Sequence, residues 1–185
     1  MHYQKTKKLV LAALFAAFTA VMAQLVIPLG FTPVPFTLAI VAVFLTGAVL
    51  DWKTALLAQG CYLLLGAVGV PVFSYFGAGL AKLAGPTGGY LLAYPLMSAA
   101  TAWLIERWGR GFLRMVVAMS TGLVVCYAFG TLQLMLLTGN GLWEALALAV
   151  FPFAAFDLVK AVLSSLVAMA LYRALRRAQL LLWIA

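Results

Sequence analysis

The feature that most constrains this chain is its succession of long apolar stretches, which are separated by charged residues or by proline. A helix needs about 20 predominantly apolar residues to cross a lipid bilayer. We expect six membrane-spanning helices, over residues 9–27, 36–50, 54–70, 88–104, 112–137 and 152–171. The predicted fold class is therefore an all-α integral membrane protein, with residues 1–185 forming a single transmembrane domain.

Composition supports lipid as the solvent for most of the chain. Hydrophobic residues make up 66% of the 185 positions and charged residues only 9%, whereas a soluble domain carries about a quarter. The first 23 residues could also be interpreted as a signal peptide ending at Ala23. Because the apolar run continues to Ile27 and further spans follow, we expect this segment to be the first span.

The basic residues are distributed unequally between the two sides of the predicted membrane. Ten of the 12 fall between apolar runs on one side, Lys82 lies alone on the other, and Lys160 lies within the sixth span. Because lysine and arginine favour cytoplasmic loops, both termini are predicted to be cytoplasmic. No stretch is both basic and water-soluble, so the net charge of +8 does not indicate nucleic-acid binding.

The connections on the predicted outer side suggest a lid over a pocket. Residues 70–89 are rich in glycine and proline, and residues 142–150 could form a short interfacial helix. Irregular backbone next to lipid is tolerated only where protein or a watery cavity satisfies its polar groups.

Two charges lie inside the sixth apolar run, where they are expensive. Asp157 and Lys160 are three residues apart, which places them on one helix face. Pro152 suits the first turn of that helix. Intramembrane charges usually line a pathway or a site. We expect a polar ligand to bind between the two groups; the alternative is an internal ion pair that fixes helix packing.

A second candidate binding segment begins at Gly85. A helix that starts after Pro86 would direct free N–H groups of residues 87–90 into the pocket, as half-helix N-termini do when they hold carboxylates. Lys82 is the only cation nearby. There is no Gly-Lys-Ser/Thr sequence, so a nucleotide site is not supported. A tightly packed loop without ligand contacts is the other interpretation.

Small residues form a stripe along the first span. They lie at a spacing that lets another helix approach closely in lipid, either within the protein or from a partner. The candidate docking residues are Ala12, Ala13, Ala16 and Ala17.

Little in the sequence suggests catalysis. The single histidine is His2, the two cysteines lie in apolar runs, and no cluster of His, Cys and acidic residues could hold a metal. An enzyme is therefore not expected, and no cofactor is predicted. A carrier driven by an ion gradient would have few coupling groups.

Four segments together resemble a known family: TPVPFTLA at 32–39, YLLLGAVGVPVF at 62–73, GPTGGYLLAY at 85–94 and FDLVKA at 156–161. They are similar to the BioY proteins, the biotin-binding S components of energy-coupling-factor (ECF) transporters. The resemblance implies a six-helix protein of the bacterial cytoplasmic membrane that captures biotin from outside. It also implies partnership with a transmembrane T component and two ATPases, which dock on the alanine stripe and hydrolyse ATP.

The resemblance assigns biotin to the pocket. Asp157 and Lys160 match the family's Asp-x-x-Lys, and would contact the ureido N–H groups and oxygen. The expected wall and loop residues are Phe36, Tyr75, Tyr90, Tyr94, Gly85, Thr87, Gly88 and Gly89. A cation often found after the GPTGGY motif is missing, so Lys160, Lys82 and the amides of residues 87–90 all remain candidates for the carboxylate. An S component for another vitamin, a stand-alone carrier and an assembly subunit are alternative functions.

Overall fold

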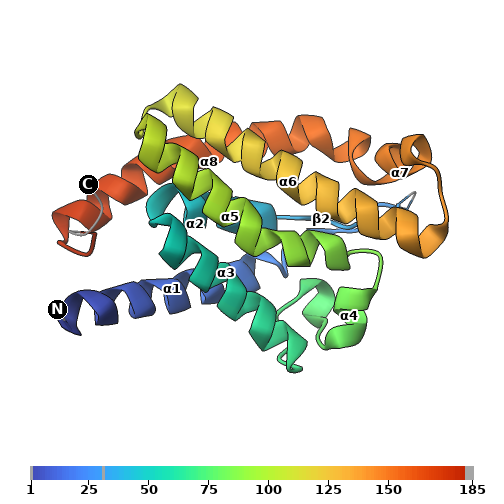
Figure 1. Cartoon of the computed structure of the whole chain (residues 1–185), viewed down its shortest axis with the longest axis horizontal. Helices are drawn as coiled ribbons and strands as arrows, with labels where there is room; N and C mark the ends of the chain where they lie inside the picture. The colour runs from blue at the N-terminus through green and yellow to red at the C-terminus, as the bar shows by residue number, and fades with distance from the viewer. Residues whose placement is uncertain (1, 31, 182–185) are drawn as a thin grey trace.

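The structure is a computed structural model that describes residues 2–30 and 32–181. Helices account for most of it, and a two-stranded hairpin interrupts them near the N-terminus (Figure 1). In chain order the elements are α1 (His2–Met22), β1 (Val26–Ile27), β2 (Phe36–Thr37), α2 (Ala39–Val49), α3 (Trp52–Ala67), η1 (Ser74–Phe76), α4 (Leu80–Ala84), α5 (Gly88–Trp108), α6 (Phe112–Thr138), α7 (Leu142–Ala149) and α8 (Phe151–Arg177).

Helices α2 and α5 form the centre of the bundle. The helix α5 packs against α2, α3 and α6, while α8 packs against α2 and α6, and α1 packs against α2 and α3. All but two of the 11 residues of α2 are buried. The start of α1 and the end of α8 lie at the same end of the molecule (Figure 1), as the prediction that both termini share one side requires.

A buried glutamine connects three of the helices. Gln59 of α3 donates from Nε2 to Thr19 Oγ1 of α1 at 2.9 Å and to Thr46 Oγ1 of α2 at 2.8 Å. Polar side chains within a lipid-facing bundle must find partners inside the protein, because hydrocarbon offers none. These bonds therefore help to fix the relative positions of α1, α2 and α3.

Four predicted spans correspond to helices α3, α5, α6 and α8, with small differences at their ends. The predictions for residues 9–27 and 36–50 were wrong at the end of the first span and at the start of the second. Helix α1 ends at Met22, and Val26–Ile27 pairs antiparallel with Phe36–Thr37. Prolines lie between the two strands, and a proline cannot continue a helix without losing a backbone hydrogen bond.

The helices differ in their ability to cross a membrane. Among the described residues, α6 and α8 are the helices long and apolar enough to do so by length and composition alone. At about 1.5 Å per residue, the 11 residues of α2 reach only about half of a hydrocarbon core of about 30 Å. Six complete spans therefore remain a prediction.

Two glutamines hold the Gly- and Pro-rich connection in place. Gln24 donates to the carbonyls of Val72 and Phe73 at 3.2 and 3.1 Å, and Gln133 donates to Leu83 and Gly85 at 2.7 and 2.8 Å. The prediction of a structured connection is confirmed, and so is a short helix near residues 142–150, present as α7.

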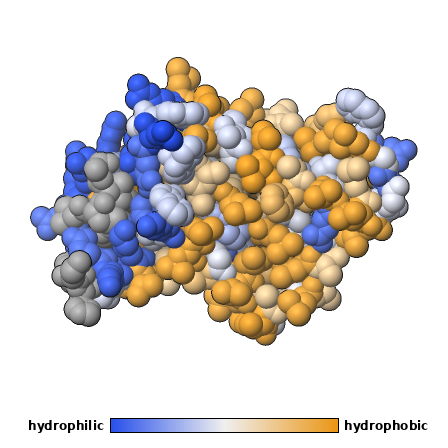
Figure 2. All heavy atoms as spheres, viewed as in Figure 1, coloured by the Kyte–Doolittle hydropathy of each residue, from blue (hydrophilic) through white to orange (hydrophobic). Residues whose placement is uncertain are grey.

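The surface divides into an apolar body and a polar end. Figure 2 shows hydrophobic residues over most of the visible face, and hydrophilic residues gathered at the end that carries the chain termini. Large exposed apolar side chains occur on several helices, for example Leu14, Val124 and Leu163. Apolar surface of this extent is suited to lipid contact.

Candidate ligand-binding site

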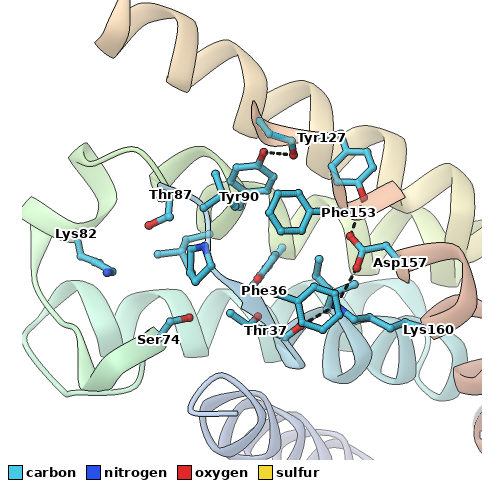
Figure 3. Close-up of a pocket in the computed structure, with 16 residues that line it drawn as sticks. Phe36, Thr37, Ser74, Lys82, Thr87, Tyr90, Tyr127, Phe153, Asp157 and Lys160 are labelled. Carbon is cyan, nitrogen blue, oxygen red and sulfur yellow. Dashed lines mark hydrogen bonds and ion pairs between the residues drawn. The ribbon is translucent and has the colours of Figure 1, made fainter. Parts of the chain in front are cut away.

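A small cavity lies between the hairpin strand β2 and helices α5, α6 and α8 (Figure 3). It offers about 50 Å³ to water-sized molecules, which is room for a few waters. Its lining consists of Val34, Pro35, Phe36, Thr37, Ile40, Ser74, Lys82, Thr87, Tyr90, Leu91, Tyr94, Tyr127, Ala149, Phe153, Asp157 and Lys160.

The two charges of α8 face this cavity and bond to each other. Helix α8 begins at Phe151 with Pro152 in its first turn, as the sequence predicts. Lys160 Nζ lies 2.8 Å from Asp157 Oδ1, and the two residues are 8% and 2% exposed. At such burial each charge needs a close partner, because desolvation of an unpaired ion costs several kcal/mol.

Two further groups complete the polar network, and the sequence did not reveal either. Tyr127 of α6 donates from Oη to Asp157 Oδ2 at 2.7 Å. Lys160 also donates to the carbonyl oxygen of Thr37, in strand β2, at 2.9 Å. Both carboxylate oxygens and the ammonium therefore have protein partners, which Figure 3 shows as dashed lines.

Aromatic rings enclose the charged pair. The Phe36 ring covers the Lys160 ammonium, with 3.6 Å between Nζ and the ring centroid. Phe36 also stacks on Phe153 at 6.5 Å and meets Phe156 edge to face at 5.7 Å. Tyr90 reaches across to α7 and donates to the Ala149 carbonyl at 2.8 Å. The cavity thus combines apolar walls with a few fixed polar groups, as ligand sites do.

Seven of the predicted binding residues line the cavity: Phe36, Lys82, Thr87, Tyr90, Tyr94, Asp157 and Lys160. Figure 3 shows Lys82 and Thr87 on one side of it and the Asp157–Lys160 pair on the other. The structure therefore brings together side chains from three separate parts of the sequence, and leaves a cation at either side.

The other four predicted residues, Tyr75, Gly85, Gly88 and Gly89, lie outside this lining. The ring of Tyr75 is exposed. Gly88 donates its N–H to Gly85 at 3.0 Å, so this amide of the expected anion site is already used. A Cβ at Gly88 or Gly89 would collide with a neighbouring backbone carbonyl, which gives both glycines a packing role. Their contact with a ligand remains a prediction.

The alanine stripe of α1 has two faces. Ala12 and Ala16 are 2% and 3% exposed and pack within the protein, whereas Ala13 and Ala17 are exposed. All four border an apolar groove between α1 and α3. The sequence left two interpretations of this stripe open, internal packing and a docking surface. In the structure Ala12 and Ala16 pack internally, whereas Ala13 and Ala17 are accessible to a partner.

In the part of the chain that the structure describes, no three His, Cys, Asp or Glu side chains lie close enough together to hold a metal ion. Cys61 and Cys126 are both free thiols.

Comparison with known proteins identifies relatives over most of the chain. The model of the BioY family matches residues 1–177. The probable biotin transporter BioY of Pyrococcus horikoshii is 40% identical over 164 residues, which are 89% of this chain and 95% of that protein. The biotin transporter BioY of Thermotoga maritima is 39% identical over 165 residues, with the same coverage of 89% and 95%.

The fold is also similar to a solved one. The crystal structure of the S-component for biotin from an ECF-type ABC transporter matches with a TM-score of 0.87 and 24% identity, over 94% of each chain. This chain therefore has the fold of that S-component. On its sequence, this chain belongs to the BioY family.

Proposed function

We propose that this chain captures biotin and delivers it into the cell as the substrate-binding subunit of an ECF-type importer. The observation that carries the proposal is the buried Asp157–Lys160 pair, which faces a cavity in a protein of the BioY family. The relatives from Pyrococcus and Thermotoga are described as biotin transporters. No chemical bond is made or broken, so neither catalytic residues nor a cofactor are required.

The chemistry of biotin matches the polar groups of the cavity. The ureido ring offers two N–H donors and one oxygen, and a carboxylate beside an ammonium offers the complementary acceptor and donor. Asp157 accepts from one ureido N–H group, and Lys160 donates to the ureido oxygen beside it. The fused rings lie against the aromatic side chains of Phe36, Tyr90 and Tyr94. The valerate carboxylate then extends toward Lys82 and the amide groups near Thr87.

The cavity must widen before it can hold biotin. Its volume of about 50 Å³ is far below the roughly 300 Å³ at which ligand pockets begin. Phe36 occupies the space above Lys160, and it belongs to a short hairpin whose strands are two residues long. Displacement of this hairpin would uncover the charged pair. It also frees the Lys160 donor that now bonds to Thr37.

Release of ligand to the inside requires an energy source that this chain lacks. No nucleotide-binding motif occurs in its sequence, so a T component and two ATPase subunits are the proposed partners. The proposed location is the bacterial cytoplasmic membrane, with the chain as a multi-pass subunit whose basic end faces the cytoplasm. The partners dock on the apolar groove between α1 and α3.

Direct binding to the purified chain tests the substrate. Tritiated biotin is added to the protein in detergent, with thiamine and riboflavin as competitors. We expect saturable binding near one biotin per chain that neither competitor displaces. Displacement by thiamine or riboflavin would instead identify an S component for another vitamin. Accumulation of biotin in liposomes that contain this chain alone would favour a stand-alone carrier.

Docking is tested on the exposed pair of alanines. Ala13→Trp and Ala17→Trp place a large ring in the groove without opening the core, because both positions are exposed. Biotin uptake by cells with the complete transporter should fall to the background level, while binding by the purified chain stays unchanged. Ala170→Trp, at an exposed position of α8 outside the groove, is the matched control. Normal uptake by both groove variants would exclude the groove as the docking surface.

A further inference from the structure

A second, larger cavity lies at the opposite end of the molecule. It is formed where the connection between α5 and α6 meets the last turns of α8, and it measures about 510 Å³. It belongs to the hydrophilic end visible in Figure 2. Seven residues line it: Arg110, Met115, Met169, Tyr172, Arg173, Arg176 and Arg177. Four positive charges thus surround one opening, and no acidic residue is among the lining.

Arg110 is the most constrained of the four. Its guanidinium carbon lies 4.1 Å from the centroid of the Tyr172 ring, so the stacking fixes the plane of the group. Nε and Nη2 are buried and have no hydrogen-bond partner. Burial, with a further contribution from Arg176, lowers the pKa of Arg110.

Neighbouring cations at this end have partners of their own. Arg114 donates to the carbonyl of Trp108 at 2.5 Å, and Arg107 lies over the Trp103 ring. Glu106, the acid that influences Arg110, accepts from the backbone N–H of Trp52 at 2.9 Å. Within the part of the chain that the structure describes, no carboxylate lies within salt-bridge distance of Arg110. Arg110 therefore lines a positively charged cavity, and its two buried nitrogens have no counter-ion within the described chain.

We propose that this cavity binds the phosphate of an anionic phospholipid from the adjacent leaflet. The fork of an arginine matches phosphate oxygens, with two parallel N–H donors. Basic pockets between membrane helices are suited to acidic headgroups. Met169, which is partly exposed, supplies an apolar wall beside the charges, and the upper part of an acyl chain packs against it. Met115 lies buried behind this wall. This apolar wall favours a lipid over a free phosphate ion.

Lipid binding by two arginine variants tests the proposal. The purified protein is mixed with phosphatidylglycerol or phosphatidylcholine in detergent, and the bound lipid is counted by native mass spectrometry. Arg110→Gln removes the central donor. Arg107→Gln makes the same charge change at an exposed position outside the cavity. We expect about a fivefold lower affinity for phosphatidylglycerol in Arg110→Gln, wild-type affinity in Arg107→Gln and little phosphatidylcholine bound to any of them.

Two further measurements separate lipid binding from misfolding and from binding of free phosphate. The double variant Arg173→Gln/Arg176→Gln alters exposed positions only, so it should fold normally and still lose phosphatidylglycerol. Inorganic phosphate at millimolar concentration should neither displace the lipid nor raise the thermal stability. Equal losses in Arg107→Gln and Arg110→Gln would overturn the proposal, because they would show a general effect of net charge. Complete displacement by inorganic phosphate would overturn the assignment to a lipid.

Discussion

The two charged regions of this protein differ in whether their buried charged groups have partners within the chain. In the cavity near α7, Asp157 and Lys160 are almost fully buried, and their polar atoms have partners within the chain. At the opposite end, Arg110 retains two buried nitrogens without a partner, next to three exposed arginines. In the first region the negative and positive charges balance each other, whereas the second region has an excess of positive charge.

The difference follows from the solvent that each region meets. A charge among apolar helices has no water to rely on, so the chain must supply the partner. A charge at the end of the bundle lies beside water and lipid headgroups, so its partner can come from outside. A ligand in the first region must therefore replace hydrogen bonds that already exist within the protein. A ligand in the second region instead supplies hydrogen bonds that the protein does not make.

The largest effect is expected at the internal pair. Asp157→Asn leaves Lys160 buried without its counter-ion, which costs about 3–5 kcal/mol of stability, and it should weaken biotin binding by at least about 100-fold. Thermal unfolding and calorimetry measure the two effects. The double variant Asp157→Asn/Lys160→Met should recover stability but not binding. Wild-type affinity in Asp157→Asn would refute the role of the carboxylate.

A smaller effect is expected from the neighbouring tyrosine. Tyr127→Phe removes one hydrogen bond to the Asp157 carboxylate. Hydrogen bonds to charged groups contribute about 1.5–3 kcal/mol, so the affinity for biotin should fall by about tenfold. Tyr62→Phe is the matched control, because the Tyr62 hydroxyl is buried and has no partner. Equal affinities in the two variants would show that Tyr127 does not position the carboxylate.

The smallest effect is expected when Arg110 is changed in lipid-free detergent. Arg110→Gln loses a cation–π contact of about 0.5–1 kcal/mol but also removes an unpaired charge, so the free energy of unfolding should change by less than about 1 kcal/mol. Thermal unfolding without added lipid measures this. A loss as large as that of Asp157→Asn would break the comparison between the regions, since it would show that Arg110 is already paired within the protein.

The sequence predicts much of the bundle and the polar centre of the site. Glycine, proline and charged residues mark the ends of α5, α6 and α8 within a few residues. Asp157 and Lys160 are conspicuous because charge is rare in an apolar run, and their spacing of three places them on one face. Such signals are local, so one sequence is enough to read them.

The remaining features depend on contacts between distant segments. The strands β1 and β2 are two residues long and lie in apolar sequence, so no alternation of polar and apolar residues reveals them. Tyr127 lies in an apolar helix 30 residues before Asp157, and only the packing of α6 on α8 brings them together. Glycines 88 and 89 gave an ambiguous signal, since close helix packing and close approach to a ligand require the same residue type.

The hydrogen bond between Lys160 and Thr37 has a thermodynamic consequence. The same ammonium that is proposed to bind cargo also holds strand β2, and with it Phe36, over the cavity. If only a fraction of the molecules has the hairpin displaced, the apparent dissociation constant exceeds the intrinsic one by the inverse of that fraction. A ligand oxygen that replaces the Thr37 carbonyl repays part of this cost, whereas an apolar solute of similar size cannot. Selectivity for cargo is then built into the opening step as well as into the bound state.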